Sequence, residues 1–171
     1  MKALVVGLGN PGKEYETTYH NVGVLALESL APEKFKKYKD LFEYAETDAT
    51  VFVRPLTYMN ESGTAVRAAL KNFKAKPASL VLIHDDSDII VGEYKISFDR
   101  NSAGHKGVQS VIDALGTKEF SRIRIGIRPA RERQRQKVGE FALKKIATKD
   151  MVVLKKVFEE IFTAPFPSSQ N

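Results

Sequence analysis

Residues 3–21 read ALVVGLGNPGKEYETTYHN. The stretch begins with a short apolar run, Ala3 to Val6, and passes directly into a glycine-rich turn. Two further apolar runs, Thr50 to Val53 and Leu80 to Ile83, are also bounded by turn residues. Short apolar runs of this kind are typical of strands that are buried on both faces. We therefore expect these three segments to form the central parallel strands of a sheet.

Two later segments alternate apolar and polar residues, which is the pattern of strands with one wetter face. The apolar positions are 94, 96 and 98 in the first segment and 123, 125 and 127 in the second. Arg122 and Arg124 occupy polar positions of the second segment. We expect both strands to lie further out in a mixed sheet.

Apolar residues at helical spacing lie between these strands and predict three amphipathic helices. Their apolar stripes are Val22, Leu25, Ala26 and Leu30; Val66, Ala69, Leu70 and Phe73; and Val108, Val111, Ile112 and Leu115. A last helix is expected from about Thr148, as its N-cap, through Ile161. Strands that alternate with helices predict an α/β sandwich.

The length and composition favour a single domain over residues 1–171. The chain has 171 residues, of which 43% are hydrophobic and 28% charged, a composition that can bury one core. No internal repeat or long linker divides it, and only the polar end, about residues 163–171, is expected to be loose. No apolar run approaches the roughly 20 residues that span a bilayer, and the N-terminus is too short for a signal sequence. These features predict a cytoplasmic protein.

Cysteine is absent, which excludes disulfides, thiol catalysis, iron–sulfur clusters and cysteine-type zinc sites. The net charge of +6 is concentrated in residues 122–137, where seven basic side chains stand against Glu132 alone. A local basic stretch on an otherwise neutral chain suggests a polyanionic partner. The alternative is a solvated arginine-rich loop.

Three polar loops are expected to meet at one edge of the sheet, because the carboxyl ends of parallel strands share an edge. They are residues 7–21, 54–60 and 84–88. The first loop matches the G-x-G-x-x-G spacing of dinucleotide-binding proteins through Gly7, Gly9 and Gly12. However, residues 13–19 lack apolar side chains in helical register, and the second strand ends at Arg54 instead of an acidic residue. Both features argue against a nucleotide cofactor.

The three histidines, His20, His84 and His105, all lie beside polar or glycine-rich loops. If Asp85 accepts a proton from one ring nitrogen of His20, the other nitrogen can take a proton from water. Such a pair is the general base of a hydrolase. His20 has a plainer alternative role, because it could simply help to start the following helix.

A divalent metal is the competing hypothesis for this edge of the sheet. The candidate ligands are His84, Asp85, Asp86 and Asp88 with His20, since carboxylate clusters suit hard cations. Acidic turns after strands are also common helix caps, and no helical histidine pair supports a metal. Asn60 similarly has a structural alternative as the N-cap of the following helix.

Five motifs follow one another along nearly the whole chain: GLGNPG at 7–12 with Tyr15 and His20-Asn21, YMNESG at 58–63, HDD at 84–86, GHKG at 104–107 and RIRIG at 122–126. Together they resemble the bacterial-type peptidyl-tRNA hydrolase family. The resemblance implies a three-layer α/β sandwich, with a mixed twisted central sheet and helices on both faces. It also implies an esterase, usually monomeric and without metal or other cofactor, that releases peptide and free tRNA from N-blocked peptidyl-tRNA. Such an enzyme would recycle tRNA from stalled or aborted translation.

The resemblance further implies roles for individual residues. His20 would be the proton acceptor and Asp85 would stabilise its basic form. Asn10 would distinguish N-blocked peptidyl-tRNA from aminoacyl-tRNA, and Asn60 would place an amide beside the scissile ester. Contacts with the 3′ end, the peptide or the acceptor stem are expected from Tyr15, Tyr58, Met59, Lys95, Arg100, His105, Lys106 and Arg124. No membrane and no obligate protein partner are expected.

The chain departs from the family pattern at several positions. Lys106 stands where the family has an asparagine, and an ammonium can donate hydrogen bonds but cannot accept them. Tyr19 replaces the common arginine before His20, and the loop 99–103 is less rich in glycine than usual. These departures leave a second hypothesis, a non-catalytic RNA-binding protein on the same scaffold.

Overall fold

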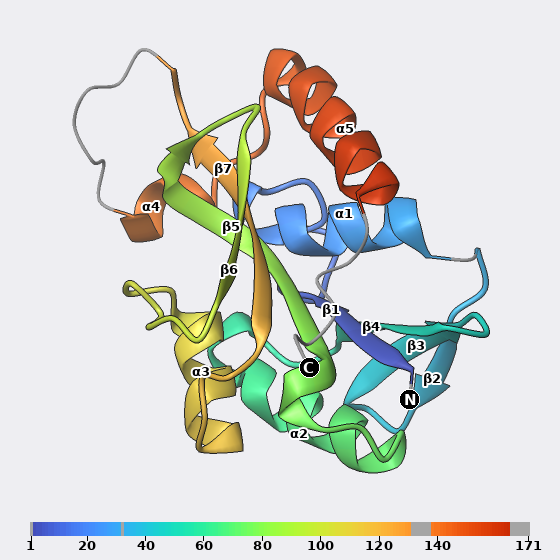
Figure 1. Ribbon diagram of the computed structural model, residues 1–171. Coiled ribbons are helices and arrows are strands. Elements are labelled where there is room, and N and C mark those ends of the chain that lie inside the picture. Colours follow the sequence, from blue (N-terminus) through green and yellow to red (C-terminus); the bar gives the residue numbers. More distant parts are fainter. Residues whose placement is uncertain (1, 32, 131–137, 165–171) are drawn as a thin grey trace.

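A β-sheet lies at the centre of the molecule, between layers of helices (Figure 1). The computed structural model describes residues 2–31, 33–130 and 138–164. Within these residues the sheet has seven strands in the order β2-β3-β4-β1-β5-β7-β6. The strands are β1 (Ala3–Gly7), β2 (Lys36–Tyr38), β3 (Phe42–Glu46), β4 (Thr50–Pro55), β5 (Leu80–Ile90), β6 (Tyr94–Phe98) and β7 (Ser121–Arg128).

The predicted central strands are confirmed. β1 pairs in parallel with β4 on one side and with β5 on the other, and β5 pairs in parallel with β7. The outer pairs, β2 with β3, β3 with β4 and β6 with β7, are antiparallel, so the sheet is mixed. Alternate side chains of β1 enter different cores: Val5 faces one, and Leu4 and Val6 face the other.

Helices cover both faces of the sheet, as expected for a three-layer sandwich (Figure 1). The α-helices are α1 (Val22–Leu30), α2 (Ser62–Asn72), α3 (Lys106–Leu115), α4 (Val138–Ala142) and α5 (Thr148–Thr163), and the short 3-10 turns are η1 (Tyr19–Asn21), η2 (Met59–Glu61) and η3 (Pro77–Ser79). Side chains of α1 and α5 fill the core on one face, and those of α2 and α3 fill the core on the other. No helix in the part of the chain that is described is long and apolar enough to cross a membrane.

The start of α1 lies unusually close to the sheet because it carries Gly23. A Cβ atom at this position would lie 2.3 Å from the carbonyl oxygen of Ile83 in β5. A Cβ at Gly7 in β1 would likewise lie 2.3 Å from the carbonyl oxygen of Gly23. Backbone therefore packs directly on backbone, and the turn η1 that precedes α1 is held beside β5.

Tyr19 anchors the other side of η1. Its hydroxyl donates to Asp150 Oδ2 at 2.6 Å and accepts from the backbone N–H of Ala147, and its ring stacks on Phe141. Burial, together with the hydrogen bond to Asp150, raises the pKa of Tyr19 to about 12. Tyr19, which directly precedes His20, is thus tied to the C-terminal part of the chain.

Several predictions about the elements are wrong. β7 has no wetter face: its residues from 121 to 127 are all buried, and Arg122 is only 2% exposed. Residues 84–88 are not a loop, because β5 continues to Ile90 with an irregularity between Asp86 and Ile90. The N-cap of α5 is Ala147 instead of Thr148. The sequence patterns also did not predict β2, β3 or α4.

Two predicted features lie outside the described residues. These are residues 131–137 of the basic segment 122–137, and residues 165–171 of the polar C-terminal end.

Candidate active site

A cavity of about 390 Å³ opens at the edge of the sheet where the three polar segments were expected to meet. It is lined by Asn10, His20, Met59, Asn60, His84, Asp85, Asp86, Ser87, Asp88, Ser102, Ala103, Gly104, His105, Lys106, Ala142 and Leu143. The N-terminal loop, η2 and the end of β5 therefore do converge. The start of α3 and the end of α4 complete the walls.

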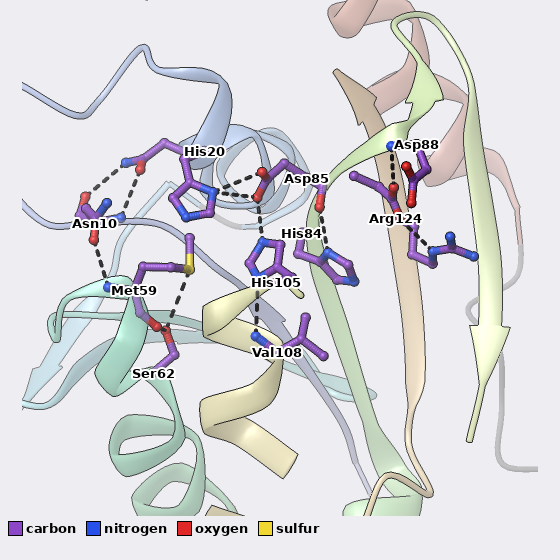
Figure 2. A network of polar contacts seen from close by, with 12 residues as sticks. Asn10, His20, Met59, Ser62, His84, Asp85, Asp88, His105, Val108 and Arg124 are labelled. Carbon is purple, nitrogen blue, oxygen red and sulfur yellow. Dashed lines mark hydrogen bonds and ion pairs between the residues drawn. The ribbon is translucent and has the colours of Figure 1, made fainter. Parts of the chain in front are cut away.

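His20 and Asp85 form a close pair in this cavity (Figure 2). Nδ1 of His20 lies 2.9 Å from both carboxylate oxygens of Asp85, which is only 3% exposed. His20 Nδ1–H donates to the carboxylate, and Nε2 makes no hydrogen bond within the described part of the chain. The imidazole therefore has one nitrogen fixed by a carboxylate and the other available to a ligand or to water.

The charges around this pair favour a proton-accepting histidine. Burial lowers the pKa of His20, but the charge and hydrogen bond of Asp85 outweigh burial and raise it above its ordinary value. Lys106 opposes this rise. Burial acts to raise the pKa of Asp85, yet its two histidine neighbours hold it well below the usual range. Asp85 is consequently a carboxylate at any pH at which His20 can be neutral.

The second neighbour of Asp85 is His105, the N-cap of α3. Its Nε2–H donates to Asp85 Oδ1 at 2.7 Å, while its Nδ1 accepts from the backbone N–H of Val108 at 3.2 Å. The sequence had suggested His105 only as a substrate contact. One signal could have indicated its position, because His105 stands three residues before Val108, where the apolar stripe begins, and an N-cap side chain binds a backbone N–H at this spacing.

His84 also lines the cavity, but it is only 2% exposed. Its Nδ1–H donates to the backbone carbonyl of Asp85 at 2.7 Å, and its ring meets that of His105 edge to face at 4.8 Å. Burial holds the pKa of His84 well below its ordinary value, helped by the neighbouring His105. The neutral ring therefore supports Asp85 from the backbone side.

Of the metal ligands considered from the sequence, the described residues bring only His20 and Asp85 into one potential ligand set. Asp86 is paired with Arg124 at 2.8 Å, and His84 is bonded to backbone. The residues that do come together are His20, Asp85 and His105, whose potential ligand atoms lie within 4.8 Å of one another. His20 Nδ1 and His105 Nε2 both donate protons to Asp85, so these nitrogens offer no lone pair to a cation. The donor set fits a hydrogen-bond network better than a metal.

Asn10 is held by hydrogen bonds on three sides. Its side-chain oxygen accepts from the Met59 N–H at 2.7 Å, and its backbone N–H and carbonyl both bond to the side chain of Asn21, at 2.8 and 2.9 Å (Figure 2). Because the oxygen is occupied, the side-chain NH₂ group is left to donate. Asn10 thus contributes a fixed amide donor to the cavity wall.

Asn60 also lines the cavity but is not a helix cap. It lies inside η2, and the N-cap of α2 is Glu61. Its side chain is exposed. The structure therefore leaves the Asn60 amide open to the cavity side of the turn.

The other predicted substrate contacts fall into two groups. Met59, His105 and Lys106 line the cavity, and the rings of Tyr15 and Tyr58 meet nearby at 6.4 Å, with Tyr58 53% exposed. The second group does not line this cavity. It consists of Lys95 and Arg100, which are both exposed, and Arg124, which is buried and paired with Asp86.

A mixed α/β sheet with a histidine–carboxylate pair in a cavity at its edge fits the class of hydrolytic enzymes. A sequence model of the family described as "Peptidyl-tRNA hydrolase" matches residues 4–165. The chain is 47% identical to the peptidyl-tRNA hydrolase of Thermodesulfovibrio yellowstonii over 133 residues, covering 72% of this chain and 71% of that one. It is 36% identical to the enzyme of Aquifex aeolicus over 166 residues, covering 92% and 84%.

Comparison with solved structures points to the same family. The crystal structure of peptidyl-tRNA hydrolase from Acinetobacter baumannii matches with a TM-score of 0.83 and 27% identity, covering 95% of this chain and 85% of that one. This chain belongs to the peptidyl-tRNA hydrolase family. The family, the fold class and the hydrolase activity expected from the sequence are thereby confirmed.

Proposed function

We propose that this enzyme hydrolyses the ester between a peptide and the 3′ end of tRNA, and that its substrate is N-blocked peptidyl-tRNA. The products would be a free peptide and a free tRNA, so that the enzyme returns tRNAs from stalled or aborted translation. The observation that carries the proposal is the contact of His20 with Asp85, 2.9 Å at each carboxylate oxygen.

The proposed reaction is a direct attack by water. His20 Nε2 takes a proton from a water molecule as the water oxygen bonds to the ester carbonyl carbon. The tetrahedral intermediate collapses, the bond to the ribose oxygen breaks, and the proton held by His20 passes to that oxygen. Asp85 stabilises the imidazolium between these two steps. No covalent enzyme intermediate is needed.

Two amides are proposed to act on the substrate directly. Asn10 has its side-chain oxygen engaged by Met59 and its NH₂ group free to donate, which suits a contact with a carbonyl oxygen. Asn60 would place a second amide beside the ester. A blocked N-terminus brings a carbonyl that a free aminoacyl group lacks, which is why Asn10 is proposed to distinguish the two substrates.

The tRNA is proposed to bind along the basic side chains near the cavity. Lys95, Arg100 and Lys106 would meet phosphates of the acceptor stem, and Tyr15 and Tyr58 would stack on the 3′ end. Arg124 is left out of this surface because it is buried and paired with Asp86. Stacking of a base on an aromatic ring is worth about 1–3 kcal/mol. Phosphate contacts fix position without reading sequence, in keeping with an enzyme that must accept many tRNAs.

A single-turnover assay tests the proposal against its alternatives. We expect release of tRNA from N-acetyl-aminoacyl-tRNA with and without a chelator, and much slower release from aminoacyl-tRNA. Loss of activity on chelation would indicate a metal enzyme. Tight binding without release would indicate the RNA-binding alternative. A cytoplasmic location and a monomeric state belong to the same proposal, and size-exclusion chromatography checks the second.

A further inference from the structure

Asp85 is shared by two histidines, and the proposed reaction uses only one of them. His20 and His105 both donate to this buried carboxylate, and their rings lie 5.0 Å apart (Figure 2). We propose that His105 is a positioning residue, which holds Asp85 and limits the negative charge that Asp85 presents to His20. This inference rests on the proposed function, because it concerns the base of that reaction.

The first turn of α3 fixes the proton of His105. Nδ1 accepts the N–H of Val108, as an N-cap side chain does, so the ring proton is on Nε2. Nε2–H points at Asp85 Oδ1 at 2.7 Å. The helix therefore determines which nitrogen donates, and His105 cannot turn away from Asp85 without uncapping α3.

A hydrogen-bond donor on a carboxylate reduces the charge left for its other neighbours. Oδ1 accepts from both histidines, whereas Oδ2 accepts from His20 alone. Without His105, Asp85 would attract the protonated form of His20 more strongly. The pKa of His20 would rise, and more of the base would be protonated and inactive at neutral pH.

Other charged and titratable groups also lie on the elements around His20. They are Asp85 and His84 on β5, Lys106 on α3, and Lys144 and Lys145 after α4. Lys106 lowers the pKa of His20. Lys145 donates to the carbonyl of Glu14, and Lys144 lies over the ring of Phe141. Because these side chains are the same in every variant at position 105, two variants that differ in capping and in reach to Asp85 isolate the contact with Asp85.

Two variants separate the positioning role from the capping role. His105→Asn keeps a good N-cap for α3, but its shorter side chain cannot reach Asp85. His105→Gln is a poorer cap, but its longer amide can still donate to the carboxylate. We expect H105N to leave the melting temperature near that of the wild type, and H105Q to lower it.

The measurement is the pH titration of the His20 ring by NMR, together with the pH dependence of kcat. We expect the loss of one donor on the shared carboxylate in H105N to shift the His20 midpoint upward by about half a pKa unit, roughly a threefold change in its acid dissociation constant. The acidic limb of kcat should move with it, while H105Q stays close to the wild type.

Either of two results would overturn the inference. One is that the midpoint of the His20 titration does not shift in H105N and only KM rises. This result would mean that His105 acts only by contacting the substrate. The other is an equal shift in both variants, which would trace the effect to the helix cap. The NMR titration needs no substrate, so it distinguishes failure of this inference from failure of the proposed function.

Discussion

Asp85 shows how a single buried residue can determine the chemistry of a site. Its carboxylate is almost without solvent, and the hydrogen bonds it accepts come from the two imidazoles. Burial alone would favour a neutral acid. The histidines reverse this preference, and in return the carboxylate makes His20 a stronger base.

The first prediction concerns Asp85→Asn, which keeps the shape of the side chain and removes its charge. We expect kcat to fall by about 100-fold or more, because His20 loses both its orientation and the stabilisation of its protonated form. With the charge gone, burial dominates and the pKa of His20 falls. The acidic limb of the pH profile of kcat should therefore move to lower pH. Full activity with an unmoved limb would contradict the assigned role of Asp85.

The second prediction concerns Lys106, one of the positions at which the sequence analysis finds a departure from the family pattern. Its ammonium lines the cavity and lowers the pKa of His20. Lys106→Asn should consequently move the acidic limb of kcat/KM to higher pH and change KM. Lys71→Asn on the exposed side of α2 removes the same charge far from the cavity and should change neither. Identical profiles for the two variants would show that Lys106 acts only through net charge.

At the scale of single residues, the sequence predicted the contact between His20 and Asp85. It did not predict that His105 also contacts Asp85. The pair was predictable because two strands that end at one edge of a sheet bring their following residues together. The sharing of the carboxylate depends on the angle at which α3 approaches the sheet, which a motif does not encode. Arg124 was similarly expected to be open to phosphate, whereas the register of β5 and β7 places it opposite His84, where it pairs with Asp86.

At the scale of secondary-structure elements, helix α1 determines where His20 lies in the site. Gly23 lets the helix backbone contact β5, and the turn η1, which directly precedes α1, contains His20. We predict that Gly23→Ala costs about 1–3 kcal/mol of stability, because the new methyl group overpacks the contact with Ile83. It should also lower kcat more than it raises KM, since His20 moves away from Asp85. Thermal unfolding and steady-state kinetics measure the two effects.

Ser29→Ala, on the exposed side of the same helix, serves as the control. It should leave both stability and kcat near the wild type. A Gly23→Ala enzyme with normal stability and kcat would mean that the close approach of α1 is not needed to position His20.

The strand segments that the sequence did not predict have one physical explanation in common. β2 and β3 are short antiparallel strands with charged residues such as Lys36, Lys37 and Glu43. Pairing of β3 with β4, and of β2 with β3, stabilises them, not local propensity. The acidic run at 84–88 reads as a turn, yet backbone pairing with β7 continues the strand through Asp86. Tertiary pairing overrides local sequence preference in each case.

For the whole molecule, charge and the position of the cavity bear on tRNA binding. The chain carries 27 basic and 21 acidic residues, and Lys95 and Arg100 are exposed on and just after β6, at one edge of the sheet. We predict that binding weakens steeply between about 50 and 200 mM salt, with a log–log slope of about 0.7–0.9 per phosphate contacted. A flat response would mean that this side does not bind RNA.

Paired variants locate the binding surface. Lys95→Ala with Arg100→Ala should reduce the slope by the equivalent of about two phosphate contacts. Lys36→Ala with Lys37→Ala lies on β2, at the opposite edge of the sheet, and should leave the slope unchanged. The reverse pattern, measured by filter binding, would place the RNA on the other side of the molecule.

The central claim is that His20, held by Asp85, removes the proton from the attacking water. The most direct test is single-turnover release of tRNA from N-acetyl-aminoacyl-tRNA by His20→Ala, with tRNA binding measured on the same preparation. We predict that release slows by about 100- to 10,000-fold while the Kd for tRNA stays within a factor of about two, because only the base is removed. Release at the wild-type rate by the verified variant would contradict the account.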